Sequence, residues 1–253
     1  MYHSVTFSLP DPITPSQNRW VKNSYSDFHL VSDGRPVISM PNPITNYIEV
    51  PGASGRLDMS ESLTNYPLYS DREGSLEFIV LNDYGPGETW ADRYQDIARH
   101  IHGRRLELSL EDDPDYFYEG RFAISGWESP SDGGNSTISI DYTLDTYKYW
   151  QRLVERTISV SGATTSMSFS YDNLTLGTMP TVPTFVVRNV TSDITITVTN
   201  PELLIHNAQH VVNHAATYQF QDIVLSDMDR CNSCSVSIAG SGTVDILIRN
   251  GDL

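Results

Sequence analysis

Residues 89–127 decide the fold of this chain and read TWADRYQDIARHIHGRRLELSLEDDPDYFYEGRFAISGW. Thr89 has the side chain of a helix N-cap, and Asp92 three residues later completes a variant of the capping box. Apolar residues then recur at helical spacing as far as Ile101, and Gly103 can end a helix in the left-handed conformation. The pattern predicts one helix from just after Thr89 to Ile101.

A β-hairpin is predicted directly after this helix. Leucines alternate strictly with polar residues over 105–111, which is the pattern of a half-buried strand. The acidic segment 112–115 should form the turn, because proline lacks an amide hydrogen and aspartate side chains bond their own backbone. Alternation over 116–124 and over 138–144 predicts two further strands. Three paired strands with one packed helix are enough for a stable sheet.

Short strands are also expected before the helix. Residues 1–10 alternate between apolar and polar side chains, which predicts a strand there. Asp33-Gly34 is a hairpin turn signal. The other expected elements are strands over 25–31, 36–40 and 76–82, and a strand from 44 that ends at Val50-Pro51-Gly52 and is followed by a glycine-containing loop to Asp58.

The second half of the chain has an almost purely β pattern. Isoleucine and valine alternate with threonine over 194–199, and turn signals recur about every ten residues, as in a β-sandwich. All four tryptophans lie at or before Trp150, so the composition changes near that point. We therefore predict a mainly β fold with two domains. The first, over 1–152, is β-rich with one α-helix packed on a sheet, and the second, over 153–253, is an antiparallel β-sandwich.

The charge of the chain excludes several classes of partner. The formal net charge is −16, with 23 acids against 11 bases in residues 1–150 and 9 against 5 in residues 151–253. Non-specific binding to nucleic acid needs a positive face and is not expected. No apolar run approaches the roughly 20 residues of a membrane helix, and the first residues show no secretory signal. We expect no membrane partner, and synthesis in the cytoplasm.

The motifs give no sign of catalysis. G-x-S-x-G, G-x-G-x-x-G and the P-loop are all absent. The acids of 111–115 could bind calcium, but Pro114 and the missing glycine exclude an EF-hand loop, so a solvated turn is favoured. We expect no enzyme activity and no cofactor.

Two groups of residues have the composition of metal ligands. His206, His210 and His214 would share one face of a helix, but their surroundings are strand-like, and four extended residues span about 13 Å, too far for ligands of one ion. Cys231 and Cys234 form one C-x-x-C, as in a redox pair or half of a zinc site, but no second pair exists. Ordinary side chains are favoured in both cases, and no bound metal is expected.

The stretch around the hairpin resembles a known family. His102-Gly103-Arg104, followed by LEDDPDYFYEGR at 110–121, resembles the hallmark segment of the distal tail (Dit) proteins of long-tailed, siphovirus-like phages. Further motifs over roughly 45–150 fit the same family: Pro51-Gly52, Gly55-Arg56-Leu57-Asp58, Leu63-Thr64-x-Tyr66-Pro67 and Tyr147-Lys148. The second half, and most of all the closing segment 240–253, is similar to the galectin-like C-terminal domain of many such proteins.

The resemblance implies a structural virion protein, a hub at the distal end of the tail. Such a hub is expected to be a homohexameric ring around the tail channel, formed by the N-terminal half. Its expected partners are other copies of itself, the tail tube protein, the tail-tip or baseplate hub protein and the tape measure protein, with DNA only in transit. It would be assembled in the host cytoplasm and reside at the tail tip of the virion. An acidic channel wall would not hold passing DNA, which fits the charge of the first half.

The residues that the resemblance points to are structural or at interfaces, and none is catalytic. One group would set a loop near the contacts between subunits, and the other would form the hairpin turn and hold the strand after it. They are Pro51, Gly52, Gly55 and Asp58 in the first group, and Asp112, Asp113, Pro114, Asp115, Tyr116, Tyr118, Gly120 and Arg121 in the second.

Two other functions remain open. The C-terminal sandwich could be a carbohydrate-binding module for a host surface polysaccharide, but sugar sites commonly use tryptophan, and none follows Trp150. Tyr171 or Tyr218 would have to serve instead, and fold analogy alone does not establish binding. A glycan hydrolase is supported only by the abundance of acids, since many pairs of carboxylates have a suitable separation.

Overall fold

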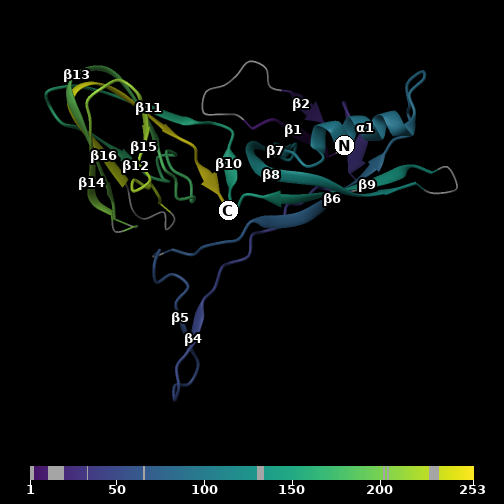
Figure 1. Ribbon diagram of the computed structural model, residues 1–253, viewed down its shortest axis with the longest axis horizontal. Helices are drawn as coiled ribbons and strands as arrows, with labels where there is room; N and C mark the ends of the chain where they lie inside the picture. The colour runs from purple at the N-terminus through teal and green to yellow at the C-terminus, as the bar shows by residue number, and fades with distance from the viewer. Residues whose placement is uncertain are drawn as a thin grey trace. The chain divides into compact units, whose positions relative to one another are not determined.

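The computed structural model describes residues 3–10, 20–32, 34–64, 66–129, 134–201, 203, 205–227 and 234–253. These residues form a mainly β protein, which confirms the predicted fold class, and α1 (Trp90–Ile101) is the one α-helix among them (Figure 1). The chain divides into two compact units: Met1–Pro43 with Tyr69–Gln151, and Ile44–Leu68 with Arg152–Leu253.

The first unit is built on one antiparallel sheet. Its strands follow the order β2-β1-β7-β8-β9-β6-β3, and β10 pairs with the start of β8. β1 pairs with β7 and β6 with β9, so segments from before the helix lie on both sides of the three strands β7, β8 and β9 that follow it. The strands are β1 (Val5–Ser8), β2 (Val21–Asn23), β3 (Leu30–Ser32), β6 (Arg72–Val80), β7 (Arg105–Leu110), β8 (Asp113–Glu128), β9 (Ser136–Leu144) and β10 (Lys148–Trp150).

The ends of α1 are those that the sequence predicts. Thr89 Oγ1 accepts a hydrogen bond from the amide of Asp92 at 3.3 Å, and the Asp92 carboxylate accepts one from the amide of Thr89 at 2.9 Å. This reciprocal capping box satisfies two amides that the first turn leaves unpaired. At the other end Gly103 has a φ of 74°, a left-handed conformation that glycine adopts without strain.

The core of the first unit lies between α1 and one face of the sheet. Ile97 and Ile101 of the helix are fully buried against strand residues that alternate inward, and each such side chain contributes roughly 1.5–3 kcal/mol by burial. On β6 and β9 the side chains of the opposite face are largely exposed. The core residues are Val5, Phe7, Phe28, Leu30, Ile38, Leu76, Phe78, Val80, Ile97, Ile101, Leu106, Leu108, Tyr118, Phe122, Ile138, Ile140, Tyr142 and Leu144.

The hairpin turn lies earlier than the sequence predicts. Leu110 pairs with Asp113, so the turn consists of Glu111 and Asp112, and residues 113–115 already belong to β8. The β7–β8 ladder is irregular between Leu108 and Leu110, and Pro114 lies opposite this irregular stretch. A proline is tolerated there because no regular ladder bond has to come from its nitrogen.

Three other predictions before the helix need correction. Residues 25–31 form a turn followed by β3, residues 36–40 form no strand, and β3 pairs with β6 instead. Residues 36–40 are held by side-chain bonds, since Ser39 Oγ donates to the carbonyl of Glu73 at 2.6 Å. The expected turn residue Asp33 lies outside the described residues.

In the strand that follows the helix, Glu107 is buried beside Ser8 although its position predicts an exposed side chain.

Residues 44–58 form a hairpin of two short strands, where the sequence predicts one strand and a loop. β4 (Tyr47–Glu49) and β5 (Arg56–Asp58) pair antiparallel, with Ile48 opposite Leu57. At the base of the hairpin the amide of Ile44 donates to the carbonyl of Leu68 at 2.7 Å. We call residues 44–68 the arm.

The rest of the second unit is a two-layered antiparallel arrangement. Two long strands, β13 and β16, pair with each other along most of their length, with interruptions of register near Ser192. The two ends of each long strand have different outer partners, so two groups of four strands form: β11, β16, β13 and β15, and β12, β16, β13 and β14. The strands are β11 (Val154–Ser161), β12 (Thr165–Phe169), β13 (Thr184–Asn200), β14 (Ile205–Val212), β15 (Thr217–Gln219), β16 (Cys234–Ile248) and β17 (Gly251–Asp252).

A bend in β16 lets this strand serve both groups. Gly240 has a φ of 115°, and a Cβ at this position would lie 3.0 Å from the Cα of Ile194. Only glycine combines that conformation with that close approach. The apolar residues of both groups, such as Ile196, Val236 and Ile246, are fully buried. The likeness of this unit to a galectin stays a prediction.

Candidate functional site

The first residues of the predicted hairpin group connect the β7–β8 turn to neighbouring segments. The carboxylate of Asp112 lies 2.8 Å from Nδ1 of His3 and 3.1 Å from Nε of Arg35. Glu111, the other turn residue, accepts hydrogen bonds from the amide and the hydroxyl of Ser4 at 3.0 and 2.9 Å. These bonds from Ser4 lower the pKa of the Glu111 carboxyl. The turn is therefore anchored to the N-terminal residues.

Asp113 and Tyr116 bind a lysine rather than their own turn. The Asp113 carboxylate lies 2.9 Å from Nζ of Lys148, and the same Nζ lies 3.8 Å from the centre of the Tyr116 ring. Pro114 and Asp115 are exposed between them, and the carbonyl of Asp115 accepts a hydrogen bond from the amide of Gln151 at 2.8 Å. This part of the motif joins β8 to β10.

Tyr118 lies against a buried arginine. The guanidinium of Arg72 is 5.5 Å from the centre of the Tyr118 ring and donates to the carbonyls of Thr146 and Ser39 at 2.8 and 3.0 Å. Burial lowers the pKa of Arg72 and raises the pKa of Tyr118. Carbonyl acceptors and an aromatic face compensate part of the cost of burying the cation.

Gly120 and Arg121 hold β8 between its neighbours. Gly120 pairs with Leu106 on one side and Leu144 on the other, and a Cβ at this position would lie 2.5 Å from the Cα of Leu144. Arg121 donates to the carbonyl of Gly103, just beyond the helix. The predicted hairpin group therefore stabilises the first unit from within.

The other predicted group belongs to the arm. Gly52 and Gly55 have φ values of 83° and 96° and form its tip, and Pro51 is exposed beside them. Asp58 accepts two hydrogen bonds from Ser60, one from the hydroxyl at 2.5 Å and one from the amide at 2.9 Å. These bonds lower the pKa of Asp58. The loop prediction is correct for residues 50–55, but Asp58 lies in a strand.

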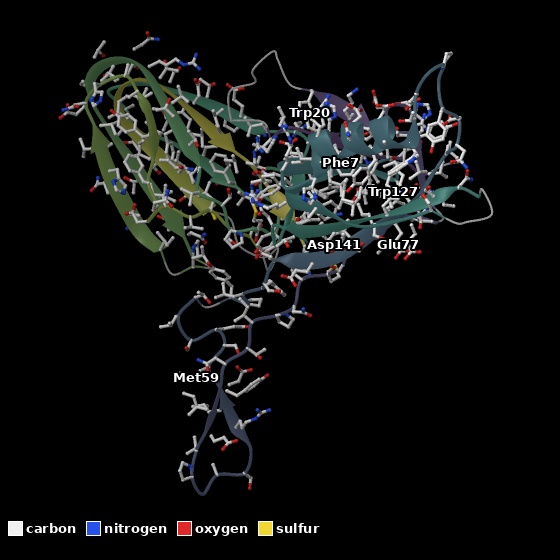
Figure 2. The ribbon with its side chains drawn as sticks, turned by 45° about the vertical axis from the view of Figure 1, so that its right-hand side comes forward. Phe7, Trp20, Met59, Glu77, Trp127 and Asp141 are labelled. Atoms are coloured by element: carbon white, nitrogen blue, oxygen red, sulfur yellow. The ribbon has the colours of Figure 1, made fainter. Side chains whose placement is uncertain are left out.

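The arm exposes a large amount of apolar surface for its size. Every residue of β4 and β5 is exposed, and Leu63 is 97% exposed. Figure 2 shows the side chains of this segment around the labelled Met59. The large apolar residues exposed on the arm are Ile44, Tyr47, Ile48, Val50, Leu57, Leu63 and Leu68.

The exposed face of the first unit's sheet is acidic. Glu77 and Asp141 lie on the side of the sheet opposite to Phe7 and α1 (Figure 2). Glu73, Glu77 and Glu128 form no ion pair within the described part of the chain. We call this surface the acidic face, and its members on β6, β9 and β8 are Glu73, Ser75, Glu77, Thr137, Ser139, Asp141, Thr143, Ser125 and Glu128.

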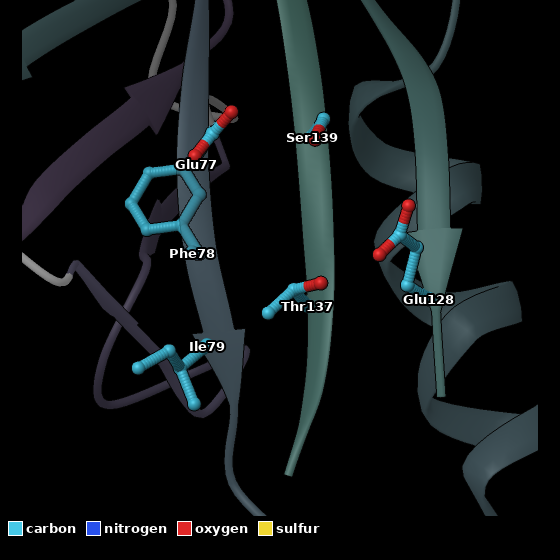
Figure 3. Close-up of a pocket in the computed structure, with 6 residues that line it drawn as sticks. All are labelled: Glu77, Phe78, Ile79, Glu128, Thr137 and Ser139. Atoms are coloured by element: carbon cyan, nitrogen blue, oxygen red, sulfur yellow. The ribbon is translucent and has the colours of Figure 1, made fainter. Parts of the chain in front are cut away.

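A hollow of about 290 Å³ lies on the acidic face (Figure 3). Its lining consists of carboxylates, hydroxyls and the edges of two apolar side chains: Glu77, Phe78, Ile79, Glu128, Thr137 and Ser139. These groups offer no nucleophile paired with a base. Its two carboxylates make the hollow better suited to repelling anions than to binding them.

The described residues contain no cluster of three His, Cys, Asp or Glu side chains that could hold a metal ion. His210 lies on β14, stacked on Phe220 with 3.9 Å between ring centres, and its Nε2 is 2.8 Å from Asp222. His214 follows in a turn, and the side chain of His206 lies outside the described residues. Cys234 is buried and donates to the carbonyl of Ser226 at 3.0 Å, while Cys231 lies outside the described residues.

Tyr218, which would have to stack on a sugar in a carbohydrate-binding module, packs on a neighbouring aromatic ring instead. Its ring stacks on Phe220 with 5.9 Å between ring centres, and its hydroxyl donates to the carbonyl of His214 at 3.0 Å. Tyr171 is half-buried. No helix in the described ranges is long and apolar enough to span a membrane.

Comparison with known proteins identifies the fold. No family model matches the sequence, and neither does any curated protein. The structure matches that of the Dit protein of phage SPP1 with a TM-score of 0.54 and 16% sequence identity, over 96% of this chain and 98% of that one. The chain has the fold of a distal tail protein. The resemblance seen in its motifs is thereby confirmed. The SPP1 protein is described as a paradigm of the hub adsorption apparatus in phages that infect Gram-positive bacteria.

Within this distal tail fold, the sequence motifs locate the residues that hold the hairpin and the arm, but not the two surfaces that stand out. The sequence signal for the acidic face is that acidic and hydroxyl side chains occupy every second position over 73–77 and 137–143. The apolar exposure of the arm has no such signal, because a sequence does not show which apolar residues stay unburied.

Proposed function

We propose that this protein is a structural component of a phage virion, a ring-shaped hub at the distal end of the tail. The observation that carries the proposal is the shared fold along nearly the whole of both chains. A local likeness would support only one module, whereas an end-to-end match supports a protein with the same set of parts. The proposed role needs no catalysis and no cofactor.

The acidic face supports a position on the wall of a DNA channel. Its carboxylates are exposed and form no ion pair among the described residues, and Asp141 accepts a hydrogen bond from the hydroxyl of Ser125 at 2.8 Å. Such a surface repels nearby phosphates, and its short serine and threonine side chains do not project into the channel. DNA would then pass without being held. In this proposal the first unit forms the ring, as a homohexamer, with β6, β9 and β8 facing the channel.

The two rims of such a ring would bind different partners. One would meet the tail tube protein and the other the tail-tip or baseplate hub protein, with the tape measure protein passing through before DNA. Assembly would take place in the host cytoplasm, and the finished protein would reside at the tail tip. The described residues provide no specific observation in favour of carbohydrate binding, because Tyr218 packs on Phe220.

The mass of the purified protein in solution tests this proposal first. Light scattering across a range of salt and protein concentration should give about six times the 28.4 kDa of one chain, and electron microscopy of the same sample should show six-fold rings. A map should then place Glu77 and Asp141 in the lumen. A protein that stays monomeric in all conditions, also with tail tube protein added, would refute the ring, and a lumen lined by other residues would refute the channel wall.

A further inference from the structure

Unpaired positive charge gathers at one place in this acidic chain. Most bases among the described residues of the first unit form ion pairs: Lys22, Arg35, Arg93, Arg105 and Lys148. Arg72 is buried. The remaining described bases of this unit are exposed and form no ion pair: Arg99, Arg104 and Arg121. The net charge of the chain is −16, so unpaired cations that gather in one place are unexpected.

Hydrogen bonds bring these arginines together where α1 ends. The amide of Gly103 donates to the carbonyl of Phe122 at 2.7 Å, and the amide of Phe122 donates to the carbonyl of Arg104 at 3.0 Å. Arg121 donates to the carbonyl of Gly103, and Arg99 lies in the last turn of the helix. The segment after the helix therefore contacts the middle of β8, and the three arginines lie on adjoining segments.

His102 adds a hydrogen-bond donor at the same place. Its side chain is exposed, and its Nδ1 accepts a hydrogen bond from the amide of Ile124 at 3.1 Å. Because a backbone amide can only donate, the ring hydrogen lies on Nε2, which can donate to a partner. We call Arg99, His102, Arg104 and Arg121 the basic cluster.

The end of the helix accounts for only part of the basic cluster. A cation in the last turn, such as Arg99, interacts favourably with the helix dipole, and Arg121 satisfies a carbonyl just beyond the helix. Arg104 has neither role, and its side chain forms no hydrogen bond or ion pair with the described residues. Exposed guanidinium groups in this state attract oxyanions, which they bind through paired hydrogen bonds.

A short acidic protein segment fits the basic cluster better than a nucleic acid does. Arg121 lies opposite Thr143, a member of the acidic face, so the cluster and the acidic face adjoin. A long polyanion on the cluster would extend beyond the screening length of about 8 Å in physiological salt and meet the carboxylates of that face. A protein segment with a few acids ends before it meets them.

We infer that the basic cluster docks a short acidic segment of a neighbouring tail protein. The guanidinium groups of Arg99 and Arg104 pair with carboxylates of that segment, and His102 donates from Nε2. The inference rests on the proposed function, because it takes the partner from the proteins that adjoin a tail hub. It adds the place on the first unit where such a protein binds and the charge that the partner surface must have.

Removal of the charges tests this docking surface. Preassembled wild-type rings and rings of Arg99→Gln with Arg104→Gln are compared, by biolayer interferometry, for binding to the purified tail tube protein and to the purified tail-tip hub protein of the same phage. One of the two proteins should bind the variant about tenfold more weakly or worse, mainly through slower association. Wild-type binding should weaken between about 0.1 M and 1 M salt, where the screening length falls from about 10 Å to about 3 Å, and binding to the variant should weaken less.

Arg152→Gln is the matched control. Arg152 is an exposed base of the second unit and forms no ion pair with the described residues. Its replacement should leave both affinities unchanged, and every variant should keep the mass of the ring and the melting temperature, because the replaced side chains are exposed. An equal loss from Arg152→Gln would show a general effect of charge and overturn the inference.

The remaining outcomes separate the inference from the proposed function. If the Arg99 and Arg104 variant binds both tail proteins as tightly as the wild type, the inference is wrong and the proposed function stands. If this variant forms no rings, the basic cluster binds another copy and the inference is also wrong. If it loses binding to a short DNA duplex that the wild type retains, the ligand is a nucleic acid instead. If wild-type rings bind neither tail protein, both proposals fail.

Carbodiimide coupling identifies the carboxylate that the cluster binds. Arg104→Lys keeps the positive charge and provides an amine, which the reagent joins to a carboxylate in direct contact. The background is low, because Lys22 and Lys148 are the only lysines of the chain. Mass spectrometry of the complex should find an amide bond between position 104 and an aspartate or glutamate of the partner protein. Bonds from position 104 only to carboxylates of the ring itself would overturn the inference.

Discussion

The ammonium group of Lys148 lies 2.9 Å from the carboxylate of Asp113, so the central acidic motif binds the strand after β9 instead of its own turn. The side chains are 35% exposed for Asp113 and 21% for Lys148. Pairs with this much solvent contribute at most about 1 kcal/mol. Asp113→Ala should therefore lower the free energy of unfolding by about 0.5–1 kcal/mol in urea titrations, and the loss should shrink in ~1 M salt, where the screening length is about 3 Å.

Two comparisons separate this ion pair from a turn effect. In the Lys148→Met background, Asp113→Ala should have almost no effect, because the partner is already absent. Asp115→Ala, two residues along on the exposed part of β8, should leave stability unchanged. An equal loss from Asp113→Ala with and without Lys148 would show that the pair is not the cause.

Gly120 should be among the least replaceable residues of the first unit. The added Cβ of Gly120→Ala would overlap the carbonyl oxygen of Thr143 and the Cα of Leu144, both backbone atoms of the neighbouring strand. Backbone in the middle of a sheet cannot move aside locally, so a loss of about 3 kcal/mol is expected. Gly126→Ala is the control in the same strand, because its Cβ would meet Ser139 at an ordinary 3.7 Å. Similar urea midpoints for the two variants would contradict the steric argument.

The sequence predicts the elements whose signals are local. Thr89 and Asp92 cap the helix by contacts within one turn, and alternation places the strands on either side of the hairpin. The exact turn is less predictable. DDPD has the composition of a turn, but the β7–β8 register places the turn one residue earlier, and register depends on which side chains reach the core.

The features that sequence misses depend on contacts between distant segments. The sequence pattern of residues 36–40 predicts a strand, but β3 pairs with β6 instead. Ser39 is held by its side chain, whose hydroxyl donates to the carbonyl of Glu73. The acidic face likewise exists only because β6 pairs with β9, which brings Glu77 opposite Ser139 from 62 positions apart in the numbering. A single sequence contains neither pairing explicitly.

Arg93 should be the most sensitive charged residue of the helix. Its side chain is 3% exposed and donates to Glu88 at 2.9 Å, to Asp83 at 2.8 Å and to the carbonyl of Leu81 at 2.7 Å. Arg93→Met keeps much of the volume but leaves these acceptors without their donor, which should cost about 3 kcal/mol. Calorimetry should show the loss. Arg99→Met, on a more exposed part of α1, should change the stability little.

The stability that Arg93 supplies should depend on pH in a definite direction. Its hydrogen bonds lower the pKa of Glu88 below the usual 4.5. For Asp83, burial acts to raise the pKa, but hydrogen bonds from Arg93 and His29 outweigh it and lower the pKa below 3.8. A carboxyl whose pKa is lowered by folding stabilises the fold above its unfolded pKa and loses that contribution as pH falls through the folded value. The difference in unfolding free energy between wild type and Arg93→Met should therefore be full at neutral pH and shrink below about pH 4.5. A difference that grows in acid would contradict the assignment.

The acidic face makes a prediction that separates a channel wall from an outer surface. Glu73→Lys with Glu77→Lys turns two exposed, unpaired acids into bases, so the fold should be unaffected and a positive patch should appear. If these residues line the lumen, preassembled rings of the variant should retain linear DNA, which enters by an end, and should not retain covalently closed circular DNA. Gel-shift titrations at several salt concentrations would measure both, because phosphate binding weakens steeply with salt.

Charge reversal on the second unit supplies the comparison. Glu155→Lys with Asp172→Lys adds the same charge at exposed positions outside the sheet of the first unit. DNA reaches an outer surface whether or not it has ends, so this variant should bind linear and circular DNA alike. If the Glu73 and Glu77 variant also binds both forms equally, the acidic face lies outside the ring. Its carboxylates would then have to act at a contact with another tail protein.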